Sequence, residues 1–237
     1  MSGARPRLAD GRYRSFDLPQ RQKAVIFERD LPAARPVPSG GGRRSRKSMA
    51  RSDNIYDVPK DLPIPVDDGA CDHLEGMRLP SLQLKSTAGR IVDLTTLSGR
   101  TILYCYPRTG RPDVDPPQGW NEIPGARGCT PQSCAFRDHF EELKTLDAGV
   151  FGLSTQTTEY QREAVERLHL PFELLSDANL AFSTAFRLPT FEVESITLIK
   201  RLTLIIRDGR VEKVFYPVFP PDSNAAEVVR WLSRHPR

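Results

Sequence analysis

The amino-acid sequence predicts an α/β fold in which helices cover both faces of a central mixed sheet. Short apolar runs typical of buried strands, such as residues 101–106 and 150–154, alternate with segments whose apolar residues recur at helical spacing. Near the end of the chain, an Asp208-Gly209 turn marks a hairpin, and a final helix follows. Strand–helix–strand units give parallel pairs and hairpins give antiparallel pairs, so we expect a mixed sheet.

The chain has 237 residues, which is enough for one domain and additional segments. Its 38% apolar and 27% charged residues fit a soluble globular protein, and no apolar run is long enough to span a membrane. Four cysteines are too few for a disulfide scaffold, and the N-terminus lacks the apolar core of a signal peptide. We therefore expect free thiols in a reducing, cytoplasmic compartment.

Residues 1–48 hold twelve Lys and Arg and four Asp and Glu, a local charge of +8, so the total of +4 leaves −4 for residues 49–237. This composition predicts a disordered basic tail, with no specific nucleic-acid partner expected. Met49 is an alternative start of the protein, because folding signals begin only after it. Residues 49–75 are proline-rich and predict an extended lead-in.

The folded domain is expected over residues 76–237. It opens with a hairpin of residues 79–84 and 91–94 around a turn at Thr87-Ala88-Gly89. The strand at 101–106 follows, and its Cys105 is expected to be a buried structural thiol.

The remaining elements follow from periodicity and capping residues. Helices are expected at 130–147, at 159–168, at 178–186 with Asp177 as its cap, and from Asn224 to Leu232 with an Asn224/Glu227 capping box. Strands are expected at 150–154, 172–175, 202–206 and 211–216. Residues 187–199 are expected to be a lengthened loop.

A candidate redox site lies at residues 128–138, GCTPQSCAFRD, directly before the predicted helix. Pro131 suits a first helical turn, so Cys129 is placed at a helix N-terminus. There the unpaired N–H groups and the helix dipole favour a thiolate, which is a nucleophile.

Cys134 follows Cys129 by five residues. On an intact helix that spacing separates the two Cα atoms by roughly 8–9 Å. A disulfide needs roughly 4.4–6.8 Å. If the two sulfurs pair, the first helical turn must therefore unwind.

The segment at 128–138 resembles the atypical two-cysteine peroxiredoxins of the PrxQ, or bacterioferritin-comigratory, type. Residues 152–155, 174–177 and 200–209 are similar to that family in order and spacing, so the likeness covers about residues 75–235. The resemblance implies a thioredoxin-like fold that begins with a hairpin. It also implies a peroxidase that reduces hydrogen peroxide and organic hydroperoxides.

In the resembling family, Cys129 would be the peroxidatic cysteine and Cys134 the resolving cysteine, and a thioredoxin-like dithiol would restore both. Arg201 would stabilise the thiolate and the departing oxygen. Lys200 would take this role instead if the match to the family is shifted by one residue. The family uses no metal or other cofactor, and many members are monomers, so we expect a monomer or weak dimer.

Residues 108–127 depart from the family pattern. The family has a proline seven residues and a hydroxyl residue three residues before the peroxidatic cysteine, where this chain has Glu122 and Ala126. We interpret the segment as an insertion that carries Trp120. Thr109 is then the candidate for the hydroxyl residue that contacts the cysteine sulfur and the peroxide.

Two alternatives to a peroxidase remain open. A peroxide-responsive redox sensor would use the same cysteine pair to switch conformation for a partner, with little turnover, and the basic tail favours it. A non-catalytic interaction protein would keep its cysteines as structural thiols.

Overall fold

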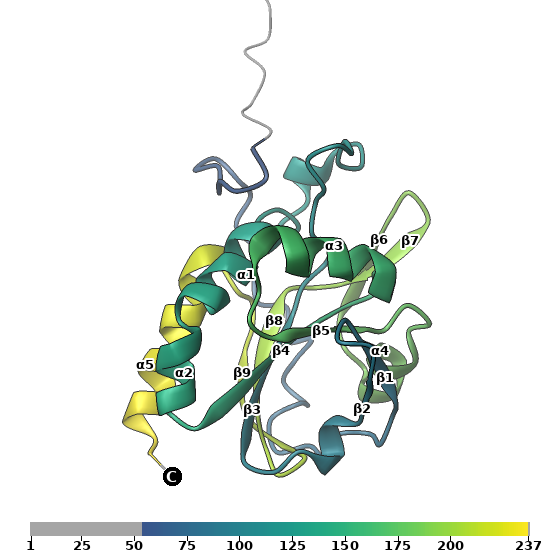
Figure 1. Ribbon diagram of the computed structural model, residues 1–237. Coiled ribbons are helices and arrows are strands. Elements are labelled where there is room, and N and C mark those ends of the chain that lie inside the picture. Colours follow the sequence, from purple (N-terminus) through teal and green to yellow (C-terminus); the bar gives the residue numbers. More distant parts are fainter. Residues whose placement is uncertain (1–53, 237) are drawn as a thin grey trace, which may run out of the picture. The chain divides into compact units, whose positions relative to one another are not determined.

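A computed structural model describes residues 54–236 (Figure 1). The chain divides into two units, Met1–Met49 and Ala50–Arg237, and all described residues belong to the second unit. The predicted basic tail, the alternative start at Met49 and the first residues of the lead-in lie outside the described residues.

Within residues 54–236 the main sheet has seven strands in the order β2-β1-β5-β4-β3-β8-β9 (Figure 1). Their bounds are β1 Leu84–Ser86, β2 Ile91–Val92, β3 Arg100–Cys105, β4 Ala148–Ser154, β5 Glu173–Ser176, β8 Leu202–Arg207 and β9 Arg210–Phe215. β3, β4 and β5 are parallel, whereas the β1–β2, β1–β5, β3–β8 and β8–β9 pairs are antiparallel. The sheet is therefore mixed, as the sequence predicts.

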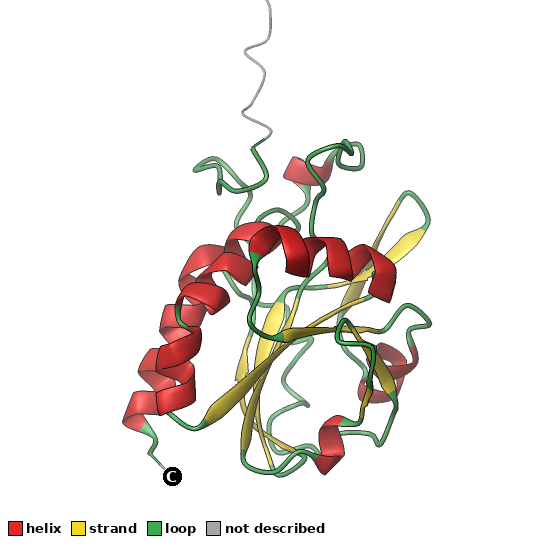
Figure 2. Cartoon of the chain, in the orientation of Figure 1, coloured by secondary structure: helices red, strands yellow, loops and turns green. Residues whose placement is uncertain are grey.

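Helices account for most of the remaining regular structure (Figure 2). The α-helices are α1 Cys129–Asp138, α2 Phe140–Thr145, α3 Thr158–Leu168, α4 Ala181–Phe186 and α5 Asn224–Arg234, and the short 3₁₀ helices are η1 Leu94–Thr96, η2 Trp120–Glu122 and η3 Pro221–Ser223. None of the helices in the described part of the chain is long and apolar enough to cross a membrane.

The alternation of side chains along β3 separates two apolar cores. Ile102 and Tyr104 join the core under α1, α2, α3 and α5. Leu103 and Cys105 join the opposite core, which includes Phe182 and Phe186 of α4 and also Leu74 from the segment before the sheet. Because successive strand residues point to opposite faces, one fully buried strand supports both layers. This is the thioredoxin-like α/β architecture, with helices on both faces and an opening hairpin.

Several predicted elements are shorter than expected, among them the strand predicted at 91–94, which is β2 at Ile91–Val92, and the helix predicted at 178–186, which is α4 at Ala181–Phe186. The strand predicted at 79–84 reduces to β1 at Leu84–Ser86, because Pro80 lacks the N–H that a paired strand requires. The helix predicted at 130–147 is divided into α1 and α2 at His139, next to Asp138, and both are weak helix formers.

The loop predicted at 187–199 is wrong, because the segment is a hairpin of β6 (Thr190–Val193) and β7 (Ile196–Ile199). Its two turn residues, Glu194 and Ser195, both have positive φ angles, of 48° and 63°. Hairpin turns of this kind usually contain Asn or Gly. Their absence hid the turn in the sequence.

The two predicted caps have different outcomes. The N-cap residue of α4 is Leu180 and not Asp177, but the Asp177 carboxylate accepts hydrogen bonds from the Phe182 and Ser183 N–H groups of the first turn at 2.9 and 2.8 Å. The capping box at Asn224 is wrong, because its side chain is fully buried and binds Gln132 and Thr203 instead.

We predict that Gly152→Ala lowers the free energy of unfolding by about 1–3 kcal/mol, because overpacking a core is costly. An added Cβ at this buried β4 position would lie 2.5 Å from Leu174 Cδ2 and 2.7 Å from the Tyr104 hydroxyl. Urea unfolding measures the change. Gly149→Ala on the same strand is the matched control, since its Cβ would meet only the Arg100 carbonyl at 4.0 Å. Equal effects of the two substitutions would contradict the prediction.

Candidate active site

The start of α1 is fixed by Gly128. Its φ angle is +101°, a conformation that favours glycine, and an added Cβ would overlap the Pro221 ring of η3. The Gly128 carbonyl accepts a hydrogen bond from the Gln132 N–H at 3.0 Å. Cys129 is therefore the first residue of the helix, where N–H groups lack helical partners, as the sequence predicts.

The Arg201 guanidinium lies directly against the Cys129 sulfur. Its Nη2 is 3.2 Å from Sγ, and both side chains are almost fully buried, with 3% exposure each. The same guanidinium donates to the backbone carbonyls of Gly125, Ala126 and Arg127, at 3.0 to 3.3 Å. The loop before α1 therefore fixes the cation in place, and a buried cation beside a sulfur favours the thiolate.

A chain of buried polar side chains holds Arg201 from the other side. Gln132 Oε1 accepts from Arg201 Nη1, and Gln132 Nε2 donates to Asn224 Oδ1 at 3.0 Å. The same Asn224 oxygen accepts from the Thr203 hydroxyl at 2.7 Å. This polar chain, Arg201–Gln132–Asn224–Thr203, connects β8, α1 and α5 inside the core.

Cys134 lies on the same helix, α1, and is half-buried. Burial raises the pKa of its thiol. The helix between the two cysteines is held against β3, since the Tyr104 hydroxyl donates to Ser133 Oγ at 3.1 Å and the Tyr104 ring stacks on Phe136 with centroids 4.6 Å apart. All four cysteines of the chain are free thiols.

The other two cysteines lie away from α1, in the core on the α4 side of the sheet. Burial raises the pKa of Cys71 to about 12 and that of Cys105 well above its ordinary value. Both thiols are therefore protonated at neutral pH, and protonated thiols are poor nucleophiles.

Two further sequence candidates are placed by their contacts. Thr109 is fully buried, and its hydroxyl donates to Gln156 Oε1 at 3.1 Å. The Gln156 amide also donates to the Thr109 carbonyl at 3.2 Å. Lys200, the alternative to Arg201 in the match to the family, points to the lead-in, where Nζ lies 2.6 Å from the Asp68 carboxylate.

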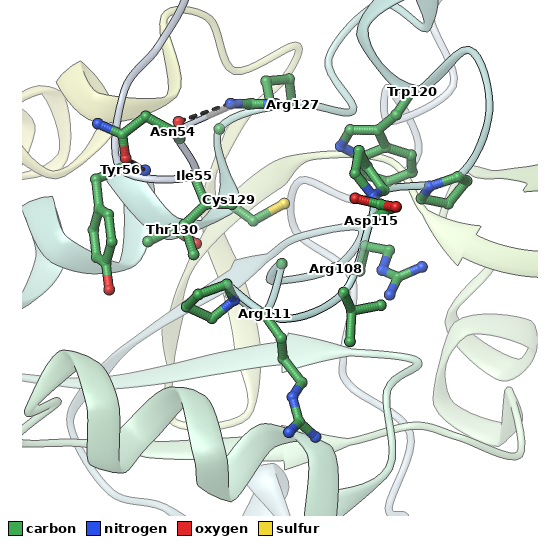
Figure 3. Close-up of a pocket in the computed structure, with 16 residues that line it drawn as sticks. Asn54, Ile55, Tyr56, Arg108, Arg111, Asp115, Trp120, Arg127, Cys129 and Thr130 are labelled. Atoms are coloured by element: carbon green, nitrogen blue, oxygen red, sulfur yellow. Dashed lines mark hydrogen bonds between the residues drawn. The ribbon is translucent and has the colours of Figure 1, made fainter. Parts of the chain in front are cut away.

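A cavity of about 240 Å³ opens onto Cys129 (Figure 3). One wall is the lead-in at Asn54, Ile55 and Tyr56, and the opposite wall is the 108–127 segment. In Figure 3 the Cys129 sulfur points into the space between these walls. The cavity gives a small molecule a path to a cysteine that is otherwise buried.

Two walls of this cavity are anchored by side-chain contacts. Trp120 is buried with Ala126 and Leu198, the latter from β7, so it fixes the 108–127 segment to the β6–β7 hairpin. On the other wall, Arg127 Nη2 donates to the Asn54 carbonyl at 2.8 Å, and Arg167 Nη1 lies 3.2 Å from the Tyr56 hydroxyl.

Comparison with known proteins identifies the family. A family model described as Redoxin matches residues 74–229. The chloroplastic peroxiredoxin Q of Sedum lineare is 30% identical over 160 residues, which cover 67% of this chain and 77% of that protein. This chain is a peroxiredoxin of the redoxin family. Peroxiredoxins are thiol peroxidases, so the chain is an enzyme, as the sequence predicts.

Other relatives place this peroxiredoxin with the Q and Bcp type. Peroxiredoxin Bcp of Escherichia coli K12 is 30% identical over 161 residues, or 66% of this chain and 93% of that protein. The structure of peroxidoxin BcpB from Mycobacterium tuberculosis matches with a TM-score of 0.57 and 24% identity, covering 68% of this chain and 98% of its own. That last likeness concerns the fold.

Sequence patterns indicated Cys129, Cys134 and Arg201, but not Gln132, Asn224 or the lead-in wall. The only signal for Gln132 was its polarity on a buried helix face, and Asn224 had a more obvious role as a cap.

Residues 54–236 contain no cluster of three or more His, Cys, Asp or Glu side chains that would hold a metal ion.

We predict that Gln132→Met slows the reaction of Cys129 with a thiol-alkylating probe about tenfold, an effect worth about 1.4 kcal/mol. The substitution keeps the length of the side chain but removes the acceptor for Arg201 and the donor to Asn224. Unfolding free energy should fall by about 1–3 kcal/mol, because buried polar groups lose their partners. The second-order rate constant of alkylation measures the first effect, and urea unfolding measures the change in the free energy of unfolding.

The control for this prediction is Gln118→Met, which changes an exposed glutamine in the 108–127 segment. If Gln132→Met were less stable but alkylated at the wild-type rate, the polar chain would have a structural role only.

Proposed function

We propose that Cys129 is the peroxidatic cysteine of this peroxiredoxin and that Arg201 stabilises its thiolate. The observation that carries the proposal is the 3.2 Å contact between the Arg201 guanidinium and a sulfur at the first position of α1, beside an accessible cavity. Raised pKa values at the thiols of Cys71, Cys105 and Cys134 support the same assignment, because they make these three cysteines poor nucleophiles at neutral pH.

In the proposed first step, the Cys129 thiolate attacks the terminal oxygen of a hydroperoxide. An S–O bond forms and the O–O bond breaks, so the sulfur is oxidised to a sulfenic acid. The other peroxide oxygen leaves as hydroxide or alkoxide and takes up a proton to become water or an alcohol. Arg201 is a suitable partner for the negative charge that develops on this oxygen.

In the second step, the Cys134 thiol condenses with the sulfenic acid to form a disulfide and release water. Both cysteines lie within α1, so they meet only if the start of the helix unwinds. A thioredoxin-like dithiol then reduces the disulfide by thiol exchange. We propose both hydrogen peroxide and organic hydroperoxides as substrates.

We retain a supporting role for Thr109 as the hydroxyl near the peroxide. Its hydroxyl donates to Gln156 in the structure and would turn toward the cavity during the reaction. Two further predictions stand: the protein is a monomer or weak dimer, and it lies in the cytoplasm. The sensor alternative, which uses the same cysteine pair, is not favoured, because the relatives are named as peroxiredoxins. The basic tail that supported this alternative lies outside the described residues.

The cysteine roles predict distinct products in two variants. Cys129→Ser should lose peroxide consumption altogether, because the nucleophile is gone. Cys134→Ser should react once and then accumulate a sulfenic or over-oxidised Cys129, because no disulfide forms. Coupled peroxide consumption and intact mass after one equivalent of peroxide distinguish these products. Cys105→Ser is the matched control and should turn over like the wild type.

Unchanged peroxide consumption by Cys129→Ser would exclude the proposed peroxidatic role. An intact Cys129–Cys134 disulfide mass in wild type, absent from both variants, would support the pairing directly.

The raised thiol pKa values predict an order of alkylation. A group whose pKa is raised forms its thiolate only at higher pH, so iodoacetamide should modify Cys134 only slowly between about pH 6 and pH 8. Cys129 should be modified first, because its sulfur lies 3.2 Å from the Arg201 guanidinium and lines the cavity. Cys71 and Cys105 should stay unmodified in the native protein up to about pH 9. Peptide mass spectrometry after timed alkylation measures the order. Faster labelling of Cys71 than of Cys129 would contradict it.

A further inference from the structure

The cavity over Cys129 is larger than hydrogen peroxide requires. Its volume of about 240 Å³ equals that of about eight water molecules, at about 30 Å³ each. Much of the wall is apolar, with contributions from Ile55, Val114, Trp120 and the prolines at 112, 116 and 117. Space and apolar surface of this kind suit a small organic group attached to the peroxide.

Arg127 also lines this cavity, and its charge is not neutralised by a carboxylate among residues 54–236. The residue is only 7% exposed, and its hydrogen-bond acceptors in the described part of the chain are neutral oxygens, namely Asn121 Oδ1 at 3.2 Å and the Asn54 carbonyl at 2.8 Å. A guanidinium has five N–H donors, so donors remain for another acceptor. Burying a cation without a counter-ion is costly, and an anion in the cavity would offset that cost.

The second buried arginine of the site shows the contrast. The three side-chain nitrogens of Arg201 donate to backbone carbonyls, to Gln132 and to the Cys129 sulfur. When the sulfur is a thiolate, it is the counter-ion of Arg201. Arg127 has no such counter-ion in the described part of the chain, although it stands only two residues before Cys129. A carboxylate on a molecule in the cavity would supply a counter-ion for Arg127.

The other charged residues on the cavity wall leave a positive balance. Arg108 donates to the Tyr160 hydroxyl at 3.3 Å and lies over the Tyr160 ring, which are both neutral partners. Arg111 is paired with Asp113 at 3.2 Å. Among the described residues that line the cavity, Asp115 is the one carboxylate, and it is exposed to solvent, where its charge is screened.

We propose that this cavity selects small organic hydroperoxides that carry a carboxylate a few carbons from the peroxide group. Arg127 binds the carboxylate, Trp120 and the prolines contact the carbon chain, and the peroxide lies at Cys129. The inference rests on the proposed peroxidase chemistry and adds a substrate class to it. Arginine matches a carboxylate with two parallel hydrogen bonds, which fixes orientation as well as charge.

The test uses two matched probes that differ in charge. These are 3-hydroperoxy-3-methylbutanoate and its primary amide, which is similar in size but neutral, with hydrogen peroxide as a third substrate. Second-order rate constants for the reaction with reduced full-length protein are measured by stopped flow. We expect the carboxylate to react about tenfold faster than the amide, because one charge-assisted hydrogen-bonded contact contributes about that factor.

Three variants assign the preference to a residue. In Arg127→Gln the ratio of the two rate constants should fall to about one, whereas Arg127→Lys, which keeps the charge, should retain part of the preference. Arg230→Gln removes an exposed arginine of α5 and should keep the wild-type ratio. A merely structural role of Arg127 in holding Asn54 would change both rate constants together and leave the ratio unaltered.

The outcomes separate the inference from the proposed function. Equal rate constants for carboxylate and amide in the wild type, with hydrogen peroxide still consumed, would overturn the inference alone. A preference that persists in Arg127→Gln would overturn the assignment to Arg127. No reaction of the wild type with any of the three peroxides would overturn the proposed function itself. The comparison of the carboxylate and amide rate constants in the wild type does not depend on whether any variant folds.

Discussion

The contact between the Arg201 guanidinium and the Cys129 sulfur is the interaction on which the arrangement of the site depends. It joins two buried side chains from distant parts of the chain, one just before β8 and one at the start of α1. Burying a guanidinium is costly unless its donors are satisfied, and for Arg201 the carbonyls of the loop before α1 and the Gln132 side chain accept from them. The loop, the helix start and the strand are therefore held in one geometry.

The cavity and the Cys129–Arg201 contact depend on the same part of the chain. Carbonyls of Gly125, Ala126 and Arg127 hold the Arg201 guanidinium. The 108–127 segment and the lead-in at Asn54–Tyr56 also form the walls of the cavity. Segments of this kind tolerate change in sequence more readily than a packed sheet does. A change in the 108–127 segment would therefore affect both the cavity and the position of Arg201.

Local patterns were sufficient to predict most of the sheet and the position of Cys129. The buried run at 101–106, the Asp208-Gly209 turn and Pro131 in a first helical turn each depend on near neighbours in sequence, and each is found. The β6–β7 hairpin was missed because its turn, Glu194-Ser195, carries no glycine or asparagine. Asn224 was assigned to a cap, whereas long-range partners turn it inward.

The cavity was beyond prediction for a similar reason. Arg127 and Asn54 are 73 positions apart in sequence, and no periodicity connects them. Their contact exists only because the lead-in returns to the start of α1. Thr109 was selected from sequence by the family's pattern, as the hydroxyl residue that would precede an insertion, but its Gln156 partner became visible only in the folded structure.

The close packing of α1 has a consequence for the lifetime of the oxidised enzyme. Between the two cysteines, Gln132 and Ser133 are fully buried and bonded to Arg201, Asn224 and Tyr104. In the proposed cycle, unwinding must break these bonds before the sulfenic acid meets Cys134. While it waits, a second peroxide molecule competes to oxidise it to a sulfinic acid. The strength of this packing therefore sets the peroxide concentration at which the enzyme inactivates itself.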